Sequence, residues 1–218
     1  MSDATPTAAP SPTAPTDLTD PADLTDTHEL SVELPDAEAT RELGRRLAGV
    51  LQAGDLLVLA GDLGAGKTTL TQGLGAGLGV RGPVTSPTFV IARVHPTLTG
   101  GPALVHVDAY RLGSAIELDD LDLDTDLDAS VVVVEWGHGV AEQLSADRVE
   151  LVLRTVGPGE ARSAVLTAIG ERWSGALAGG ALAAALGGAG SAALSSSSSY
   201  AAHSADADAA SSGEPANN

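Results

Sequence analysis

The chain has no cysteine and only one lysine, Lys67, among its 218 residues. Without cysteine it can form neither disulfide bonds nor metal sites with thiolate ligands. No positively charged stretch followed by an apolar segment stands near residue 1, so we expect no secretory signal and take the cytoplasm as the expected location. The apolar stretch at residues 182–194 consists mostly of glycine and alanine, which makes it too weak for a membrane span.

Basic residues are also scarce. The chain has 11 Lys and Arg against 29 Asp and Glu, for a formal net charge of −18. All 11 basic residues lie within residues 28–173, together with 21 acidic ones, which leaves this region near −10. Such a surface repels nucleic acid. If the protein acts in a process that involves RNA, we expect a protein partner to hold the RNA.

Both ends of the chain have a composition unlike that of a folded domain. Residues 1–27 are mainly Thr, Pro, Ala and Asp, and residues 174–218 are mainly Gly, Ala and Ser. Segments of this composition bury too little surface to offset chain entropy, so we predict a disordered tail at each end. A single domain over residues 28–173 remains, which is long enough for a real core.

The clearest motif is a phosphate-binding loop (P-loop), G-x-x-x-x-G-K-T, at residues 61–68. An apolar run at residues 56–60 predicts a buried strand before it, and the segment after it, to about Val80, predicts a helix. Glycines let the backbone approach a polyphosphate so that N–H groups converge on the β-phosphate. The residues expected to bind nucleotide here are Gly61, Asp62, Leu63, Gly64, Ala65, Gly66, Lys67, Thr68 and Thr69.

Lys67 is expected to reach the β- and γ-phosphate oxygens, and Thr68 to offer its hydroxyl to Mg²⁺. The helix N-terminus adds partial positive charge. A chance match is the alternative in a chain with 26 glycines. The strand and helix signals argue against it, as does a lone lysine at the one position where a compact ammonium is needed.

Two further apolar runs end in carboxylates. The run at residues 103–108 ends in Asp108, and four valines at residues 131–134 precede Glu135. Carboxylates at the ends of buried strands beside a P-loop hold Mg²⁺ and its water shell, so we expect one acid for metal and one to orient water. The alternative for Asp108 is a cap on the following turn. Outside these runs, strands are expected at residues 29–34, 148–155 and 161–169, and a helix follows an Asp36 cap.

Two segments have open interpretations. Ser86-Pro87-Thr88 is either a loop that senses the γ-phosphate or an ordinary Ser-Pro turn before a strand. Residues 117–128 carry seven carboxylates but lack the glycine and terminal glutamate of a calcium loop. We interpret this acidic run as an amphipathic element with a solvated face, or as a docking face for a basic partner.

Taken together, the motifs resemble the TsaE (YjeE) family. The resemblance rests on GDLGAGKTT at residues 61–69, SPTF at 86–89, HVDAYRL at 106–112, VEW at 134–136 and EAR at 160–162, in matching order and spacing. It covers roughly residues 29–170. It implies an α/β fold: a single P-loop NTPase-type domain with a mixed, mostly parallel sheet flanked by helices.

The resemblance also implies a function. TsaE proteins hydrolyse ATP slowly with Mg²⁺, coupled to a complex of TsaB and TsaD that transfers the threonylcarbamoyl group to adenosine in tRNA, next to the anticodon. ATP or ADP and Mg²⁺ are therefore the expected cofactors, and the TsaB–TsaD complex the expected partner.

The same resemblance assigns roles within the site. Thr68 and Glu135 would be Mg²⁺ ligands, and Asp108 a catalytic carboxylate that contacts the metal directly or through water. Catalysis would then rest on Lys67, Asp108 and Glu135. Ser86 and Thr88 would form a switch loop, and Trp136 would lie near the nucleotide. Arg162 and the Asp36–Thr40 segment, with Thr40 as the contact, would border the adenine and ribose.

Three other functions are compatible with a P-loop. A small-molecule P-loop kinase would need an acceptor pocket and an arginine-bearing lid, and no arginine-rich insert follows the core. A GTPase would need an Asn/Thr-Lys-x-Asp motif, but the only lysine belongs to the P-loop. A nucleotide-gated binding module, in which hydrolysis is incidental, overlaps the TsaE interpretation and would differ from it in turnover with and without partners.

Overall fold

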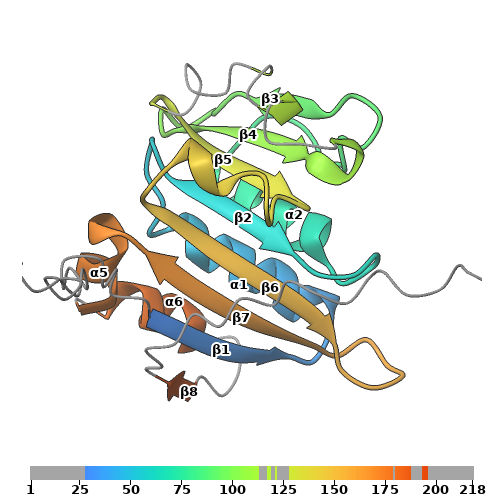
Figure 1. Ribbon diagram of the computed structural model, residues 1–218, viewed down its shortest axis with the longest axis vertical. Coiled ribbons are helices and arrows are strands. Elements are labelled where there is room, and N and C mark those ends of the chain that lie inside the picture. The colour runs from blue at the N-terminus through green and yellow to red at the C-terminus, as the bar shows by residue number, and fades with distance from the viewer. Residues whose placement is uncertain are drawn as a thin grey trace, which may run out of the picture.

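A mixed eight-stranded sheet with helices packed on it forms the fold (Figure 1). The computed structural model describes residues 28–112, 117–118, 121, 128–178, 180–187 and 193–195. The strands are β1 (His28–Leu34), β2 (Leu56–Ala60), β3 (Ala92–His95), β4 (Ala103–Asp108), β5 (Ser130–Glu135), β6 (Arg148–Thr155), β7 (Arg162–Ile169) and β8 (Ala193–Ser195). The helices are α1 (Ala37–Ala48), α2 (Lys67–Leu78), α5 (Glu171–Ala178) and α6 (Ala181–Gly187), with 3₁₀ turns η1 (Ala109–Arg111) and η2 (Glu142–Leu144). Within these described ranges, no helix has the length and apolar character needed to cross a membrane.

The strand order is β3-β4-β5-β2-β6-β7-β1-β8. Neighbours among β4, β5, β2 and β6 run parallel, whereas β3 and the group β7-β1-β8 add antiparallel strands at the two edges. A single α/β P-loop-type domain with a mixed sheet is thereby confirmed. The expectation of a mostly parallel sheet was wrong, because in the part of the chain described here three pairings are parallel and four are antiparallel.

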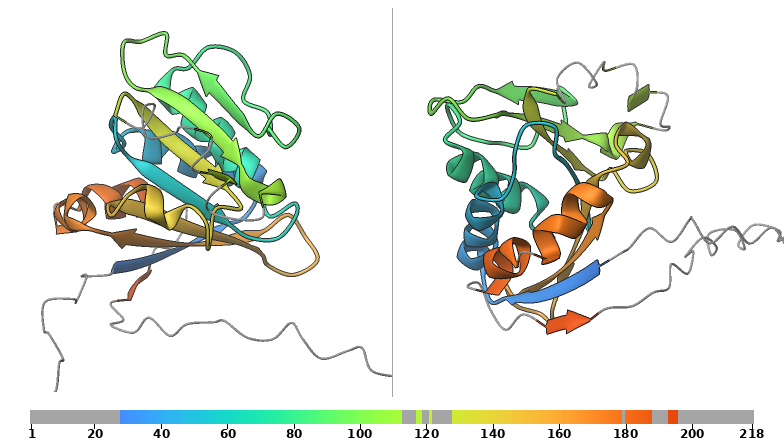
Figure 2. Two further views of the ribbon diagram at one scale, coloured as in Figure 1. Left: turned by 45° about the horizontal axis from the view of Figure 1, so that its top comes forward. Right: turned by 90° about the vertical axis from the view of Figure 1, so that its left-hand side faces the viewer.

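The two faces of the sheet are covered differently. One face packs against α1, α2 and α6 and contains the larger core, which includes Leu43, Leu70 and Trp173 (Figure 2). A smaller core on the other face contains Leu118 and Ala141 and has no long helix over it in the described ranges. Most of the acidic run at residues 117–128 lies outside the described residues, so its predicted amphipathic face is not tested.

Helix α2 contains three glycines, although each costs about 1 kcal/mol relative to alanine in a helix. Close packing explains them: Gly73 and Gly77 face α1, and Gly75 faces Val84. A Cβ at Gly73 would lie 2.0 Å from the Arg41 carbonyl oxygen, and one at Gly44 of α1 would lie 2.2 Å from the Leu70 carbonyl oxygen. The two helix backbones therefore approach more closely than side chains would allow, and this contact anchors α2 behind the P-loop.

The predicted start of a disordered tail at residue 174 was wrong. Helix α5 continues to Ala178, and α6 follows with Leu182 and Leu186 fully buried in the core shared with α1 and β1. These leucines are four residues apart and so share one helix face, a pattern that the surrounding glycine and alanine obscured. The predictions for residues 1–27, 188–192 and 196–218 lie outside the described residues.

Candidate active site

The P-loop joins the end of β2 to the start of α2, as its sequence predicts. Gly61, Gly64 and Gly66 have φ angles of +132°, +80° and +109°, which L side chains rarely adopt. A Cβ at Gly61 would also lie 2.2 Å from the Leu153 carbonyl oxygen. Gly66 caps α2 without a side-chain hydrogen bond, and the first turn carries no acidic residue. The first N–H groups of α2 can therefore face an anion.

Lys67 is held over this loop. Its Nζ donates hydrogen bonds to the carbonyl oxygens of Gly61 at 2.6 Å and Asp62 at 3.0 Å, and it lies 3.6 Å from the centre of the Trp136 ring. Burial lowers the pKa of the Lys67 ammonium, and the negative charges of Glu135 and Asp108 oppose that shift. Phosphate oxygens would offer this ammonium stronger acceptors than neutral carbonyls do.

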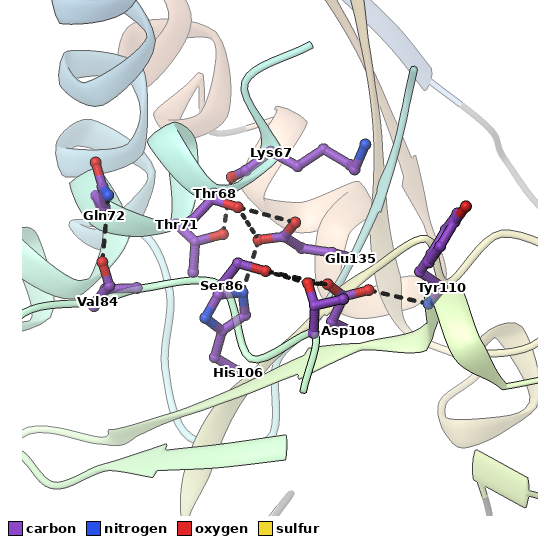
Figure 3. Close-up of polar contacts among 11 residues, drawn as sticks. Lys67, Thr68, Thr71, Gln72, Val84, Ser86, His106, Asp108, Tyr110 and Glu135 are labelled. Atoms are coloured by element: carbon purple, nitrogen blue, oxygen red, sulfur yellow. Dashed lines mark hydrogen bonds and ion pairs between the residues drawn. The ribbon is translucent and has the colours of Figure 1, made fainter. Parts of the chain in front are cut away.

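The two strand-end carboxylates are brought together as predicted. Strands β4 and β5 are parallel, and their register pairs Asp108 with Glu135. Glu135 is 3% exposed and accepts hydrogen bonds from Thr68 Oγ1, at 2.8 Å to Oε1 and 3.1 Å to Oε2 (Figure 3). The P-loop hydroxyl and the β5 carboxylate thus lie side by side, as two ligands of one metal ion would.

Asp108 has a different set of partners. Its Oδ2 accepts hydrogen bonds from Ser86 Oγ at 3.2 Å and from the Thr88 hydroxyl, and its Oδ1 accepts from the backbone N–H of Tyr110 at 3.0 Å. Asp108 therefore caps η1, as the alternative interpretation predicts, and it also lines a cavity together with P-loop residues; its role toward Mg²⁺ stays a prediction. The Ser86-Pro87-Thr88 segment likewise lies at the site, with its two hydroxyls 2.6 Å apart.

A cavity of about 270 Å³ connects these groups. Its lining residues come from the P-loop, the segment around Ser86 and the ends of β4 and β5: Leu63, Gly64, Gly66, Lys67, Thr68, Thr69, Ser86, Thr88, Asp108, Glu135 and Trp136. A smaller hollow lies on the other side of the P-loop, between the start of α1 and the β6–β7 hairpin, and Thr40, Thr69, Glu160 and Arg162 are part of its lining.

Arg162 donates a hydrogen bond from its guanidinium to the Gly64 carbonyl oxygen at 3.3 Å, while the Thr40 hydroxyl donates to the Asp36 carbonyl oxygen at 3.2 Å. Arg162 and Thr40, which are predicted to border the adenine and ribose, therefore both lie beside the P-loop. They lie apart from the carboxylates, in the smaller hollow.

Sequence reasoning assigned no role to His106 or Tyr110. His106 Nε2 lies 2.8 Å from Glu135 Oε1, and the Tyr110 ring packs against the Trp136 ring with 5.2 Å between centroids. Trp136 itself has a φ of +60°, which is rare for a bulky residue. One signal was available for His106: it precedes Asp108 by two residues on a strand and so shares its face.

The donor set determines which metal fits. Searching the described ranges finds no cluster of three or more His, Cys, Asp or Glu side chains that could hold a metal ion alone. Mg²⁺ is usually bound by one or two carboxylates together with phosphate oxygens and waters. The Thr68 hydroxyl with Glu135, and with Asp108 nearby, fits such a shared site.

The family model and the similar proteins carry the same family name. Residues 34–163 match the family model "Threonylcarbamoyl adenosine biosynthesis protein TsaE". The Streptomyces coelicolor protein named "tRNA threonylcarbamoyladenosine biosynthesis protein TsaE" is 64% identical over 138 residues, which are 62% of this chain and 93% of that protein. A Bacillus subtilis protein of the same name is 40% identical over 137 residues, covering 62% and 84% of the two chains.

Among solved structures, the chain resembles the crystal structure of Bacillus subtilis YdiB. The TM-score is 0.59 at 32% sequence identity, and the match covers 72% of this chain and 96% of that one.

Proposed function

The chain belongs to the TsaE family, and we propose that it acts in the biosynthesis of threonylcarbamoyladenosine in tRNA as a Mg²⁺-dependent ATPase. One observation carries the proposal: a single cavity is lined by the P-loop lysine, by the Thr68–Glu135 pair and by Asp108. These are the charge, the metal ligands and the water-orienting group that phosphoryl transfer requires.

In the proposed mechanism, the N–H groups of the P-loop and of the first turn of α2 bind the phosphates. Lys67 exchanges its carbonyl acceptors at Gly61 and Asp62 for oxygens of the β- and γ-phosphates. Thr68 and Glu135 would hold Mg²⁺, which supplies positive charge against the phosphate oxygens when bound. Arg162 and Thr40 border the base and ribose from the smaller hollow.

Asp108 orients the attacking water and accepts its proton. The water oxygen forms a bond to the γ-phosphorus, the bond from that phosphorus to the bridging oxygen breaks, and ADP and inorganic phosphate leave. The hydroxyls of Ser86 and Thr88 keep the carboxylate aimed at this water. Preorganised groups of this kind supply most of the catalysis in phosphoryl transfer.

We also propose that hydrolysis is coupled to the TsaB–TsaD complex and takes place in the cytoplasm. The acidic surface supports contact with protein rather than with RNA, since the 28–173 region carries 21 acidic residues against 11 basic ones. In this arrangement the partners hold the tRNA and carry out the transfer.

ATP hydrolysis by the full chain tests the proposal, measured alone and with TsaB and TsaD from the same organism, with GTP as the nucleotide control. We expect slow hydrolysis that the partners change. Lys67→Ala should lower turnover by about 100-fold or more, because it removes a charge that stabilises the transition state. Lys67→Arg is the matched variant and should not restore activity, since a guanidinium is a planar fork rather than a compact charge.

Turnover unchanged in Lys67→Ala would contradict the assignment of the site. Rapid phosphate transfer to a small acceptor, independent of TsaB and TsaD, would instead identify a small-molecule kinase.

A further inference from the structure

His106 is a buried polar side chain beside the candidate site that the proposed mechanism leaves without a role. It lies on β4 and is fully buried, with its Nε2 2.8 Å from Glu135 Oε1. The β4–β5 register pairs His106 with Val133 and Asp108 with Glu135, so the contact runs diagonally between the strands. Figure 3 shows the imidazole and the Thr68 hydroxyl both directed at the Glu135 carboxylate.

The direction of this hydrogen bond follows from the carboxylate. An ionised carboxylate only accepts, so the His106 Nε2 must donate. The Nδ1 atom is buried and has no hydrogen-bond partner among the residues that the structure describes. A hydrogen at Nδ1 would leave a buried donor unsatisfied, at a cost of about 1–3 kcal/mol. The Nε2 atom is therefore the ring atom that donates, and its acceptor is Glu135 Oε1.

The two carboxylate oxygens of Glu135 are consequently not equivalent. Oε1 accepts from both His106 and Thr68 at 2.8 Å, whereas Oε2 accepts only the longer Thr68 contact at 3.1 Å. When Thr68 turns its oxygen toward a metal, the imidazole still holds Oε1. The carboxylate then cannot rotate freely, and Oε2 keeps its direction toward the P-loop.

We propose that His106 is a positioning residue that fixes the orientation of the Glu135 carboxylate for Mg²⁺ bound with nucleotide. The inference rests on the proposed function, because it concerns the same metal site. Partners that orient metal ligands through a second hydrogen bond typically change metal affinity or activity by about 10- to 100-fold when removed.

His95 offers an internal control. It is also a buried histidine, on the neighbouring strand β3, and the register of Arg93 with His106 places both histidines on one face of the sheet. Burial lowers the pKa of the His95 imidazole, and within the described part of the chain its Nε2 has no hydrogen-bond partner. It donates nothing to Glu135, so its removal tests the loss of a buried ring without the loss of the positioning contact.

The experiment compares four variants of the full chain: His106→Gln, His106→Asn, His106→Leu and His95→Gln. Nucleotide binding is measured by calorimetry across a Mg²⁺ titration and again with excess EDTA, and thermal unfolding is recorded for each variant. The Gln amide nitrogen can occupy the position of Nε2 and donate to Glu135. The shorter Asn amide corresponds to the Nδ1 position and does not reach that oxygen.

We expect His106→Asn and His106→Leu to raise the Mg²⁺ concentration for half-maximal binding by about 10-fold or more, with nucleotide affinity in EDTA unchanged. His106→Gln should restore most of the Mg²⁺ response, and His95→Gln should match the parent chain. Equal Mg²⁺ responses in the Gln and Asn variants would overturn the positioning role, even if the Leu variant fails to fold. If the parent chain itself binds nucleotide without any response to Mg²⁺, the proposed function fails instead.

Discussion

Asp108 and Glu135 are the same kind of side chain at equivalent positions, yet their surroundings differ. They are register partners at the ends of β4 and β5, and each is 3% exposed. Glu135 receives its hydrogen bonds from His106 on β4 and from Thr68 on α2. Asp108 receives its side-chain hydrogen bonds from Ser86 and Thr88, which lie outside any helix or strand.

This difference separates a carboxylate held by regular secondary structure from one held partly by a loop. The partners of Glu135 belong to the sheet and to a helix that packs backbone to backbone on α1. The segment that holds Asp108 ends at Ile91, whose φ of +68° is unusual for a β-branched residue and costs about 1–3 kcal/mol. The Ile91 carbonyl oxygen accepts from the Asp108 backbone N–H at 2.8 Å. The first arrangement would suit the proposed metal ligand, and the second would suit the proposed water-orienting group.

Replacing Asp108 should produce the larger effect on turnover. In Asp108→Asn the side chain keeps its shape and its acceptor for the Tyr110 N–H, but it no longer takes a proton. We expect the kcat for ATP hydrolysis to fall by about 10²- to 10⁴-fold, the range typical of a lost general base. Measured by calorimetry, the Mg²⁺ dependence of nucleotide binding should stay near that of the parent chain.

The control is Asp55→Asn, which changes a buried aspartate that pairs with Arg172 outside the cavity. It should leave kcat unchanged. If Asp108→Asn instead shifted the Mg²⁺ requirement as strongly as a Glu135 variant does, the two carboxylates would share one role and the comparison would fail.

Replacing Glu135 should act mainly on the metal. In Glu135→Gln, Thr68 and His106 donate to a weaker, neutral acceptor. One negative charge is also lost at the proposed metal site. The Mg²⁺ concentration for half-maximal nucleotide binding should rise by about 10- to 100-fold. Affinity for nucleotide in EDTA should not fall, because the P-loop amides and Lys67 bind phosphate without Glu135.

Glu150→Gln is the matched variant for this measurement, since Glu150 is a buried β6 carboxylate that pairs with Arg148. An unaltered Mg²⁺ titration in Glu135→Gln would exclude it as a metal ligand.

The sequence predicts most of the site because its signals are local. The P-loop and the apolar runs ending in Asp108 and Glu135 each depend on a few adjacent residues, and the structure brings them together. The contact of His106 with Glu135 depends on the β4–β5 register, across 29 positions of sequence, which no local pattern encodes. The sequence also leaves open whether Ser86-Pro87-Thr88 is only a turn, because its hydroxyls gain a partner only once β4 lies beside them.

The same contrast between local signals and long-range contacts applies to the fold. Strands with alternating or continuous apolar residues, such as β1 and β5, were predicted where they lie. Helix α6 was missed, since only Leu182 and Leu186 distinguish it from a low-complexity segment, and their burial depends on α1 and β1. The parallel share of the sheet was overestimated for a similar reason: strand order is a long-range property that neither composition nor spacing specifies.

The smallest of these effects is expected when the hydroxyls around Asp108 are removed. In the double variant Ser86→Ala, Thr88→Val, Asp108 keeps its charge and its backbone N–H partner but loses two side-chain donors. Because the charge and the backbone donor remain, we expect kcat to fall by only about 10-fold, which corresponds to about 1.4 kcal/mol, with the Mg²⁺ requirement unchanged. The control is Thr97→Val, Thr99→Val, which removes a hydroxyl pair of similar spacing, 3.1 Å, away from the cavity. A kcat equal to that of the control would mean that Asp108 is oriented by the backbone alone, and that the 86–88 segment is only a turn.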